Sequence, residues 1–317
     1  MTAAGGAERR VLRLGFVDLD TSHPEAFLPL LRAMGHDVVA VCDAGVVHAP
    51  GAAERFARRH GIAEVVAGPT AMIDLVDVAF VLGCDWEQRL QRARPLVEAG
   101  VPVFLDKPIA GTAAALRQVV AWKEAGHRVA GGSALRRLAP AREWAGSHRS
   151  GPVFALAGTS GHPLDFGVHA YALLQALLGA DVVSVRDLGG APGVRAELCW
   201  SDARRGVAAI WPQRGQHPYY ATVAAEDGVV QLTATAAPLY QDLLDATLPY
   251  LCGEGPDPTP GGSLVLPERC ALAVLASRAA GGRSLALTAP EVDEVAFPSA
   301  TFVDTYRVEH APASARW

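Results

Sequence analysis

Cysteine is scarce in this sequence and is not spaced as in disulfide-bonded or zinc-binding proteins. The 317 residues include five cysteines, no two of them close together: Cys42, Cys84, Cys199, Cys252 and Cys270. The number is odd and no CxxC pair occurs, which argues against a disulfide framework and against a zinc knuckle. We therefore expect reduced thiols, a cytoplasmic location and no metal site.

Concentrated positive charge and long apolar runs are also missing. The chain has 28 Lys and Arg against 33 Asp and Glu, a formal net charge of −5, and its basic residues are scattered among acidic ones. Nucleic acid and anionic membrane surfaces are therefore not expected as partners. No apolar run approaches the roughly 18–20 residues that span a bilayer. The N-terminal MTAAGGAERR lacks the apolar stretch of a signal peptide.

Apolar residues, in contrast, are plentiful. Half of the residues are hydrophobic and 19% are charged, which is typical of chains with a large buried core. A length of 317 residues is long for one domain and suits two.

Short apolar segments alternate with amphipathic ones from residue 11 to about 130. Strands are expected at 11–17, 37–42, 76–82, 101–105 and 127–130, and helices at 24–34, 52–60, 87–99 and 113–125. This alternation predicts a Rossmann-like, doubly wound parallel sheet within an N-terminal domain of residues 1–132. Such sheets bind ligands at the carboxyl ends of their strands.

The pattern changes in the second half of the chain. Helices are expected at 140–147, 165–178 and 266–280, and strands at 153–159, 181–188, 194–200, 206–211, 219–225 and 229–235. Consecutive strands predict an α+β domain, residues 133–317, with an open and mostly antiparallel sheet. No flexible linker separates the halves, so we expect the two domains to share an interface and a cleft.

The turn after the first strand lacks the glycines of a dinucleotide-binding loop. It reads Asp18-Leu19-Asp20-Thr21-Ser22-His23, where GxGxxG would let the backbone approach a pyrophosphate. A carboxylate about 4 Å from a phosphate costs on the order of 4 kcal/mol at an effective dielectric constant of 20. The hydroxyls of Thr21 and Ser22 and a cationic His23 could still contact a pyrophosphate. Alternatively, Asp20, Thr21 or Ser22 only caps the following helix.

Asp43 follows the second strand, where an acidic residue binds a ribose hydroxyl in many dinucleotide-binding domains. Its carboxylate would repel a 2′-phosphate and so favour NAD over NADP. An ordinary turn residue is the alternative.

Two further motifs point to acid–base chemistry. Asp106-Lys107-Pro108 ends the fourth strand, and Asp165-Phe166-Gly167-Val168-His169 opens a helix. Residues four apart share one face of a helix, so Asp165 and His169 are expected to lie together. In the alternative interpretation, Asp165 is only a helix N-cap and His169 a surface residue bonded to it.

These motifs, in this order, resemble the glucose–fructose oxidoreductase / inositol dehydrogenase (Gfo/Idh/MocA) family. That family has Glu-Lys-Pro after the fourth strand and Asp-x-Gly-x-His at a helix start in its second domain. The resemblance implies an NAD(P)-dependent oxidoreductase acting on a sugar, cyclitol or similar metabolite. It places Lys107 and Pro108 beside the nicotinamide. His169 would be the general base or acid, and Asp165 would hold the substrate or orient His169. A histidine near its ordinary pKa suits this chemistry.

Two departures from the family pattern support alternatives. Besides the missing glycines, Asp85-Trp86-Glu87-Gln88-Arg89 stands where the family has Pro-Asn-x-x-His. A non-redox lyase, isomerase or cyclase that keeps the acid–base residues is one alternative. A non-catalytic sensor is another.

Candidate substrate residues follow from residue type and position: Arg137, His162, Trp211, His217 and Tyr219. An arginine can bind a carboxylate or phosphate. Aromatic rings can stack on a sugar, although aromatics in strands more often pack in a core or an interface. The resemblance also implies a homo-oligomer formed through the open face of the second sheet.

Overall fold

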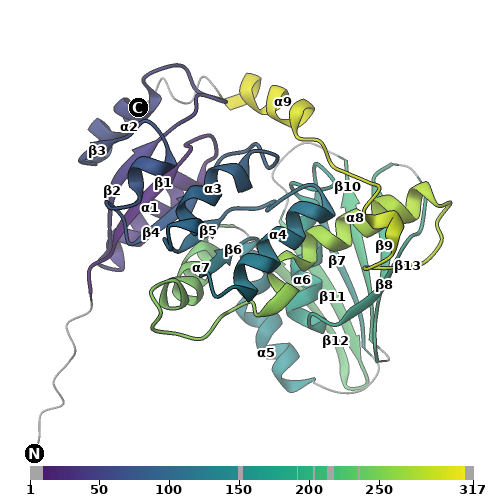
Figure 1. The fold of residues 1–317 in the computed structure, drawn as a ribbon. Helices are drawn as coiled ribbons and strands as arrows, with labels where there is room; N and C mark the ends of the chain where they lie inside the picture. Colours follow the sequence, from purple (N-terminus) through teal and green to yellow (C-terminus); the bar gives the residue numbers. More distant parts are fainter. Residues whose placement is uncertain are drawn as a thin grey trace, which may run out of the picture.

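The chain forms two β-sheets, each covered by helices, that lie side by side (Figure 1). The structure is a computed structural model that describes residues 10–148, 153–190, 192–202, 204–212, 218–234 and 236–310. Within these ranges no helix is both long and apolar enough to cross a membrane.

The first sheet is parallel throughout, in the order β3-β2-β1-β4-β5-β6. Its strands are β1 Arg13–Val17, β2 Asp37–Cys42, β3 Glu64–Val65, β4 Val78–Val81, β5 Val103–Leu105 and β6 Val129–Gly131. The helices between them are α1 His23–Ala33, α2 Ala52–His60, α3 Arg89–Glu98 and α4 Ala113–Glu124. The central strands are buried, because helices cover both faces of a doubly wound sheet. The predicted Rossmann-like sheet is confirmed.

The second sheet has the order β12-β11-β7-β10-β9-β8-β13, and of its pairs only β7 with β10 is parallel. Its strands are β7 Phe154–Ser160, β8 Val182–Asp187, β9 Val194–Trp200, β10 Arg205–Trp211, β11 Tyr219–Ala225, β12 Gly228–Ala234 and β13 Leu285–Ala286. The predicted mostly antiparallel sheet is therefore confirmed.

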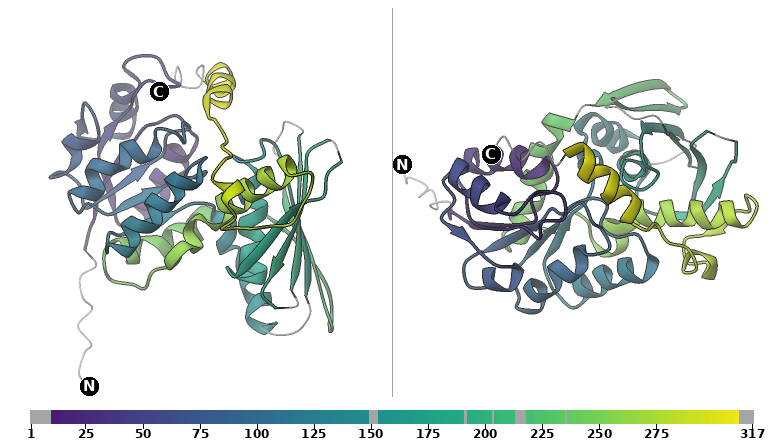
Figure 2. Two further views of the ribbon diagram at one scale, coloured as in Figure 1. Left: turned by 45° about the vertical axis from the view of Figure 1, so that its right-hand side comes forward. Right: turned by 90° about the horizontal axis from the view of Figure 1, so that it is seen from above.

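One face of the second sheet packs against helices α6 Gly167–Leu178 and α8 Leu266–Ala279, and α5 Ala139–Ser147 packs against α6. In the described part of the chain the other face carries no helix (Figure 2). Ten of the twelve residues of α6 are buried, so this helix holds its side chains in fixed positions.

Two helices were not predicted: α7 Ala236–Leu251 and α9 Ala300–His310. Prolines at 238 and 249 obscure the helical pattern of α7, and β-branched residues weaken that of α9. The strand predicted at 76–82 is β4, because the two-residue strand β3 before it was not predicted. The division at residue 132 stays a prediction; α9, from the second range, packs against the first domain (Figure 1).

Candidate active site

Lys107 and Asp165, more than fifty residues apart in sequence, form an ion pair at the domain interface. Lys107 directly follows β5, and Asp165 lies in the turn before α6. The Lys107 Nζ lies 3.0 Å from Asp165 Oδ1 and 3.3 Å from the Asp165 carbonyl oxygen. Burial lowers the pKa of Lys107, but the carboxylates of Asp165 and Asp106 outweigh burial and raise it to about 12. The lysine is therefore a fixed positive charge.

His169 stands in the first turn of α6, and its partner is Ser133. His169 Nδ1 lies 2.8 Å from Ser133 Oγ, and its ring centroid lies 4.7 Å from that of Tyr219. Burial lowers the pKa of His169 well below 6.5, and the positive charge of Lys107 lowers it further. The ring is thus neutral at physiological pH, which suits a general base.

Two expectations about His169 are wrong. Its pKa is not near the ordinary value, because the side chain is buried beside a cation. Nor does Asp165 orient it as a helix neighbour or cap α6. The helix begins at Gly167, with Asp165 before it, and the Asp165 carboxylate turns to Lys107. Ser133 was not among the predicted site residues, because it lies 36 positions from His169 and no sequence spacing links the two.

Two of the predicted substrate residues lie at this site. Tyr219, the first residue of β11, packs on His169. Burial raises its pKa, Lys107 lowers it and Asp165 raises it, and the net change is upward, so Tyr219 is a protonated phenol. His162 Nδ1 accepts the backbone N–H groups of Leu164 and Asp165, both at 3.2 Å. His162 therefore shapes the turn that carries Asp165.

Other predicted substrate residues lie away from this site. The Arg137 guanidinium donates to the carbonyl oxygen of Pro258 at 3.0 Å. Trp211 ends β10 with 53% of its surface exposed. Neither has a described contact with Lys107 or His169. His217 lies outside the described residues.

The DLDTSH loop turns its carboxylates inward. Asp18 has a positive φ of 63°, and its Oδ1 accepts the backbone N–H of Ala44 at 3.1 Å. Asp20 Oδ2 accepts the backbone N–H of Cys84 at 3.0 Å, and its buried Oδ1 has no partner among the described residues. A Cβ placed on Gly83 would lie 2.9 Å from Asp18 Oδ2 and 3.3 Å from Asp20 Oδ2. Both carboxylates thus occupy the space between the ends of β1 and β4.

Burial opposes charge on both of these aspartates. Burial raises the pKa of Asp20 to about 7, and the neighbouring Asp18 contributes in the same direction. Burial also raises the pKa of Asp18, against the nearby Arg92. A pyrophosphate in this space would meet two acidic side chains instead of glycine N–H groups, and would raise the energy of their charged forms.

Two other polar side chains of the loop, Thr21 and His23, bond within the protein. Ser22 precedes α1 but makes no side-chain capping bond, whereas Thr21 Oγ1 accepts the His23 backbone N–H and donates to the Leu82 carbonyl. His23 is not directed at a pyrophosphate. Its Nδ1 lies 2.5 Å from Asp106 Oδ2, and its Nε2 lies 3.1 Å from the Tyr240 hydroxyl.

Asp43 lies at the carboxyl end of the first sheet, as predicted, just after β2. Its Oδ1 accepts the backbone N–H of Leu19 at 3.5 Å. Asp43 therefore helps to hold the DLDTSH loop, and its ribose role stays a prediction.

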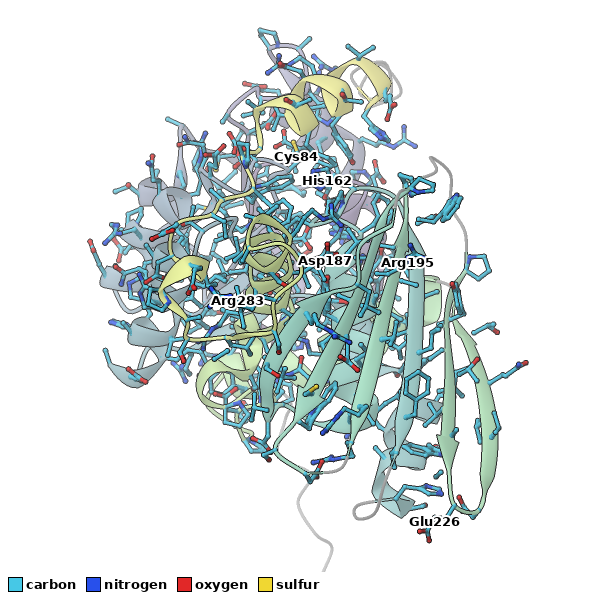
Figure 3. All side chains as sticks on the ribbon, turned by 90° about the vertical axis from the view of Figure 1, so that its right-hand side faces the viewer. Cys84, His162, Asp187, Arg195, Glu226 and Arg283 are labelled. Atoms are coloured by element: carbon cyan, nitrogen blue, oxygen red, sulfur yellow. The ribbon has the colours of Figure 1, made fainter. Side chains whose placement is uncertain are left out.

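Helix α9 covers the same end of the first sheet. Val303 packs with Val47 and Cys84, and Arg307 Nε donates to the Val46 carbonyl at 2.7 Å. Figure 3 shows Cys84 and His162 beneath this helix, where the two domains meet. The ring of Phe302 lies 5.0 Å from that of Trp86 and 5.6 Å from that of His162. The helix thus contacts both domains where they meet.

The segment that departs from the family pattern anchors α9. Ser299, just before the helix, donates its backbone N–H to Glu87 Oε2 at 2.8 Å. Its hydroxyl lies 2.6 Å from Asp85 Oδ1 and 2.7 Å from Glu87 Oε2. Trp86 Nε1 also donates to the Phe297 carbonyl at 2.8 Å. The residues at 85–89 that differ from the family pattern are therefore the ones that bind the segment before α9.

A nicotinamide dinucleotide does not fit this arrangement. The Asp18 and Asp20 carboxylates lie beside Gly83, in the loop where a pyrophosphate would need hydrogen-bond donors, and α9 packs against Val46 and Val47 after β2. Within the described ranges, no three His, Cys, Asp or Glu side chains are grouped so that they could hold a metal ion.

Comparison with known proteins was informative only at the level of structure. No family model and no curated protein matches the sequence. A probable dehydrogenase from Thermotoga maritima superposes with a TM-score of 0.75 at 14% identity, covering 87% of this chain and 99% of that one. This chain has the Gfo/Idh/MocA fold.

Two more structures with this fold were determined with nicotinamide nucleotide. GenD2 from gentamicin A biosynthesis, in complex with NAD, has a TM-score of 0.74 at 17% identity, covering 91% of this chain and all of that one. Myo-inositol dehydrogenase from Lactobacillus casei, in complex with NAD(H) and myo-inositol, has a TM-score of 0.71 at 16% identity, covering 90% and 100%. At these identities the Gfo/Idh/MocA fold is shown, and the activity is a separate question.

Proposed function

We propose that this protein is an enzyme that moves protons on a sugar, cyclitol or similar metabolite without a nicotinamide dinucleotide. The observation that carries the proposal is a contrast within one cleft. A neutral His169 lies beside the Lys107–Asp165 ion pair, whereas Asp18 and Asp20 fill the nucleotide loop. Lyases, isomerases and cyclases that act next to a carbonyl need a neutral base beside a fixed positive charge. They do not need a pyrophosphate-binding loop.

The proposed chemistry assigns one role to each residue. Neutral His169 accepts a proton from a carbon next to a substrate carbonyl, or from a substrate hydroxyl. The Lys107 ammonium stabilises the negative charge that develops on the substrate oxygen. Asp165 holds the lysine in place through the 3.0 Å contact, and the Ser133 hydroxyl holds the imidazole. A positioned acid or base of this kind accelerates proton transfer by about 10²–10⁴-fold.

The test is proton exchange without added nucleotide. The protein is incubated in deuterated buffer with keto-sugars and keto-cyclitols, and deuterium incorporation is measured by mass spectrometry. We expect incorporation that His169→Gln abolishes and that His148→Gln, a histidine far from the cleft, leaves unchanged. If exchange persists in His169→Gln, the role assigned to His169 is wrong.

A nicotinamide-dependent oxidoreductase is the second candidate. It is favoured by the fold and by the NAD and NAD(H) complexes of the similar structures. This activity would require α9 to leave the first domain and the Asp18–Asp20 space to open, and Asp43 would favour NAD over NADP. Calorimetric titration of the purified protein with NAD⁺, NADH, NADP⁺ and NADPH separates the two candidates. Saturable binding of any of them at micromolar concentration would overturn the nucleotide-free proposal.

A further inference from the structure

A second chain of proton-carrying groups lies beside Lys107, and the proposed acid–base chemistry does not use it. It joins Asp106 after β5, His23 at the start of α1 and Tyr240 in the first half of α7. His23 Nδ1 lies 2.5 Å from Asp106 Oδ2, and His23 Nε2 lies 3.1 Å from the Tyr240 hydroxyl. Three segments that are remote in sequence thus place a carboxylate, an imidazole and a phenol in line.

The carboxylate end of this chain is fixed and charged. Asp106 is 2% exposed, and its Oδ1 accepts the backbone N–H of Lys107 at 2.7 Å. Burial alone would raise the pKa of Asp106, but His23 outweighs it and the net change is downward. An ionised carboxylate requires the proton of a neutral imidazole to be on Nδ1, which leaves the Nε2 lone pair facing the Tyr240 hydroxyl.

The phenol end lies on a helix that packs against the candidate active site. Helix α7 contacts β5, which ends just before Lys107, and the 3₁₀ helix Ala134–Arg137, which follows Ser133. Burial raises the pKa of Tyr240 to about 12, and Lys107, Asp106 and Tyr219 are the charged or titratable groups close enough to affect it. The Tyr240 ring packs edge-on against His23 and Phe27, with both centroid distances 5.2 Å. Tyr240 is therefore held between the His23 ring and the groups that surround the substrate position.

We infer that Tyr240 is a second acid–base residue of this enzyme, with His23 and Asp106 acting through it as a proton relay. A substrate hydroxyl gives its proton to the Tyr240 oxygen, while the Tyr240 proton passes to His23 Nε2. The resulting imidazolium is stabilised by the Asp106 carboxylate, as in hydrolase triads that join a carboxylate, an imidazole and a hydroxyl. The reverse transfers protonate an alkoxide or a leaving oxygen. Only protons move, so the step needs no oxidant or reductant.

This inference rests on the proposed function for its substrate class, but its central requirement can be tested without a substrate. Nitrogen NMR of the full-length protein labelled in histidine reports which ring nitrogen of His23 carries the proton, with His23→Gln used for assignment. We expect the proton between His23 and Asp106 to lie on Nδ1 and Nε2 to accept from the Tyr240 hydroxyl. We also expect the Nε2 signal to move in Tyr240→Phe and to stay unchanged in Tyr250→Phe, the same substitution farther along α7. A proton on Nε2 would overturn the relay.

The second arm uses the proton-exchange assay. Tyr240→Phe keeps the ring and removes only the hydroxyl, so we expect kcat to fall about 10²-fold or more with KM within a few fold. Asp106→Asn should lower kcat as well and shift the His23 proton to Nε2. An unchanged kcat, or a rise in KM alone, would show that Tyr240 only binds or packs. If wild-type protein shows no exchange at all, the proposed function fails, and the NMR result still decides the relay.

Discussion

The carboxylate of Asp20 accepts a hydrogen bond from the backbone N–H of Cys84 across the ends of β1 and β4. The Asp20 side chain of the DLDTSH loop therefore bonds to the residue stretch that follows β4. In a glycine-rich nucleotide loop this position would face a pyrophosphate. The second Asp20 oxygen is buried without a partner among the described residues, so this contact is sensitive to protonation.

We first predict that protonation of Asp20 stabilises the protein. Burial raises its pKa to about 7 in the folded state, against an ordinary value of 3.8. A carboxyl whose pKa is raised by folding contributes stability below its unfolded pKa, and that contribution is lost as the pH rises through about 7. The loss at pH 8 is at most on the order of 4 kcal/mol. Asp20→Asn, which mimics the protonated form, should melt at a higher temperature than wild type at pH 8, and the difference should shrink as the pH falls and vanish below about pH 4. Asp74→Asn, at an exposed position, serves as the control. A difference that does not depend on pH would contradict the assignment.

Second, we predict that the anchor at Ser299 controls the closure of α9. Ser299→Ala removes the hydroxyl contacts with Asp85 and Glu87 and leaves carboxylates with fewer partners, a loss of about 1–3 kcal/mol. Hydrogen exchange followed by mass spectrometry should show faster exchange in α9 and unchanged exchange in α6. Ser147→Ala, in helix α5, is the matched control. If α9 exchanges at the wild-type rate, its position does not depend on this anchor.

Our third prediction concerns the charge next to His169. Lys107 lowers the pKa of His169, in addition to the larger effect of burial. Lys107→Met should therefore raise the pKa of His169 toward 6.5, whereas Lys107→Arg should keep it low. The ring C–H signals of His169 in a pH titration by NMR give this value directly. Identical titrations of His169 in the two variants would show that Lys107 does not act on it electrostatically.

A fourth prediction concerns the helix-free face of the second sheet. Phe154 is 47% exposed and Tyr220 is 42% exposed, and the Tyr220 ring lies over Gly158 on the strand between β11 and β10. Exposed apolar faces of this kind commonly form interfaces between identical subunits. We expect a homo-oligomer in analytical ultracentrifugation that Phe154→Asp or Tyr220→Asp reduces toward monomer. Val308→Asp, on the exposed side of α9, should leave assembly unchanged. A monomeric wild-type protein would contradict the expectation.

Much of the fold could be predicted from local pattern. The alternation of apolar segments and amphipathic helices placed β2, α2 and β9 with their observed ends, because side-chain periodicity directly reflects which face of an element is buried. The same approach missed α9, whose sequence ATFVDTYRVEH has no strong apolar stripe. That helix is held largely by contacts with Val46, Val47 and Cys84 of the first domain.

The pairing of the site residues could be predicted only in part. The two motifs around Lys107 and Asp165 indicated one site, but the partners of the two histidines did not follow from spacing. Ser133 is 36 residues from His169, and Tyr240 is 217 residues from His23. Such contacts form because α1 packs against α7, and α6 packs against the 3₁₀ helix η2 (Ala134–Arg137). Both packings bring segments together that are distant in sequence.

The same division holds for the DLDTSH loop. Its composition alone showed that carboxylates stand where glycines were expected and that ordinary pyrophosphate binding is disfavoured. Whether these side chains would face solvent, a ligand or the protein interior depended on the fold. Only the tertiary structure places the Ala44 N–H near Asp18 and the Cys84 N–H near Asp20. It also brings Asp106 to His23. A buried carboxylate costs free energy unless it is hydrogen-bonded, so its partners are set by the N–H groups that the fold places near it.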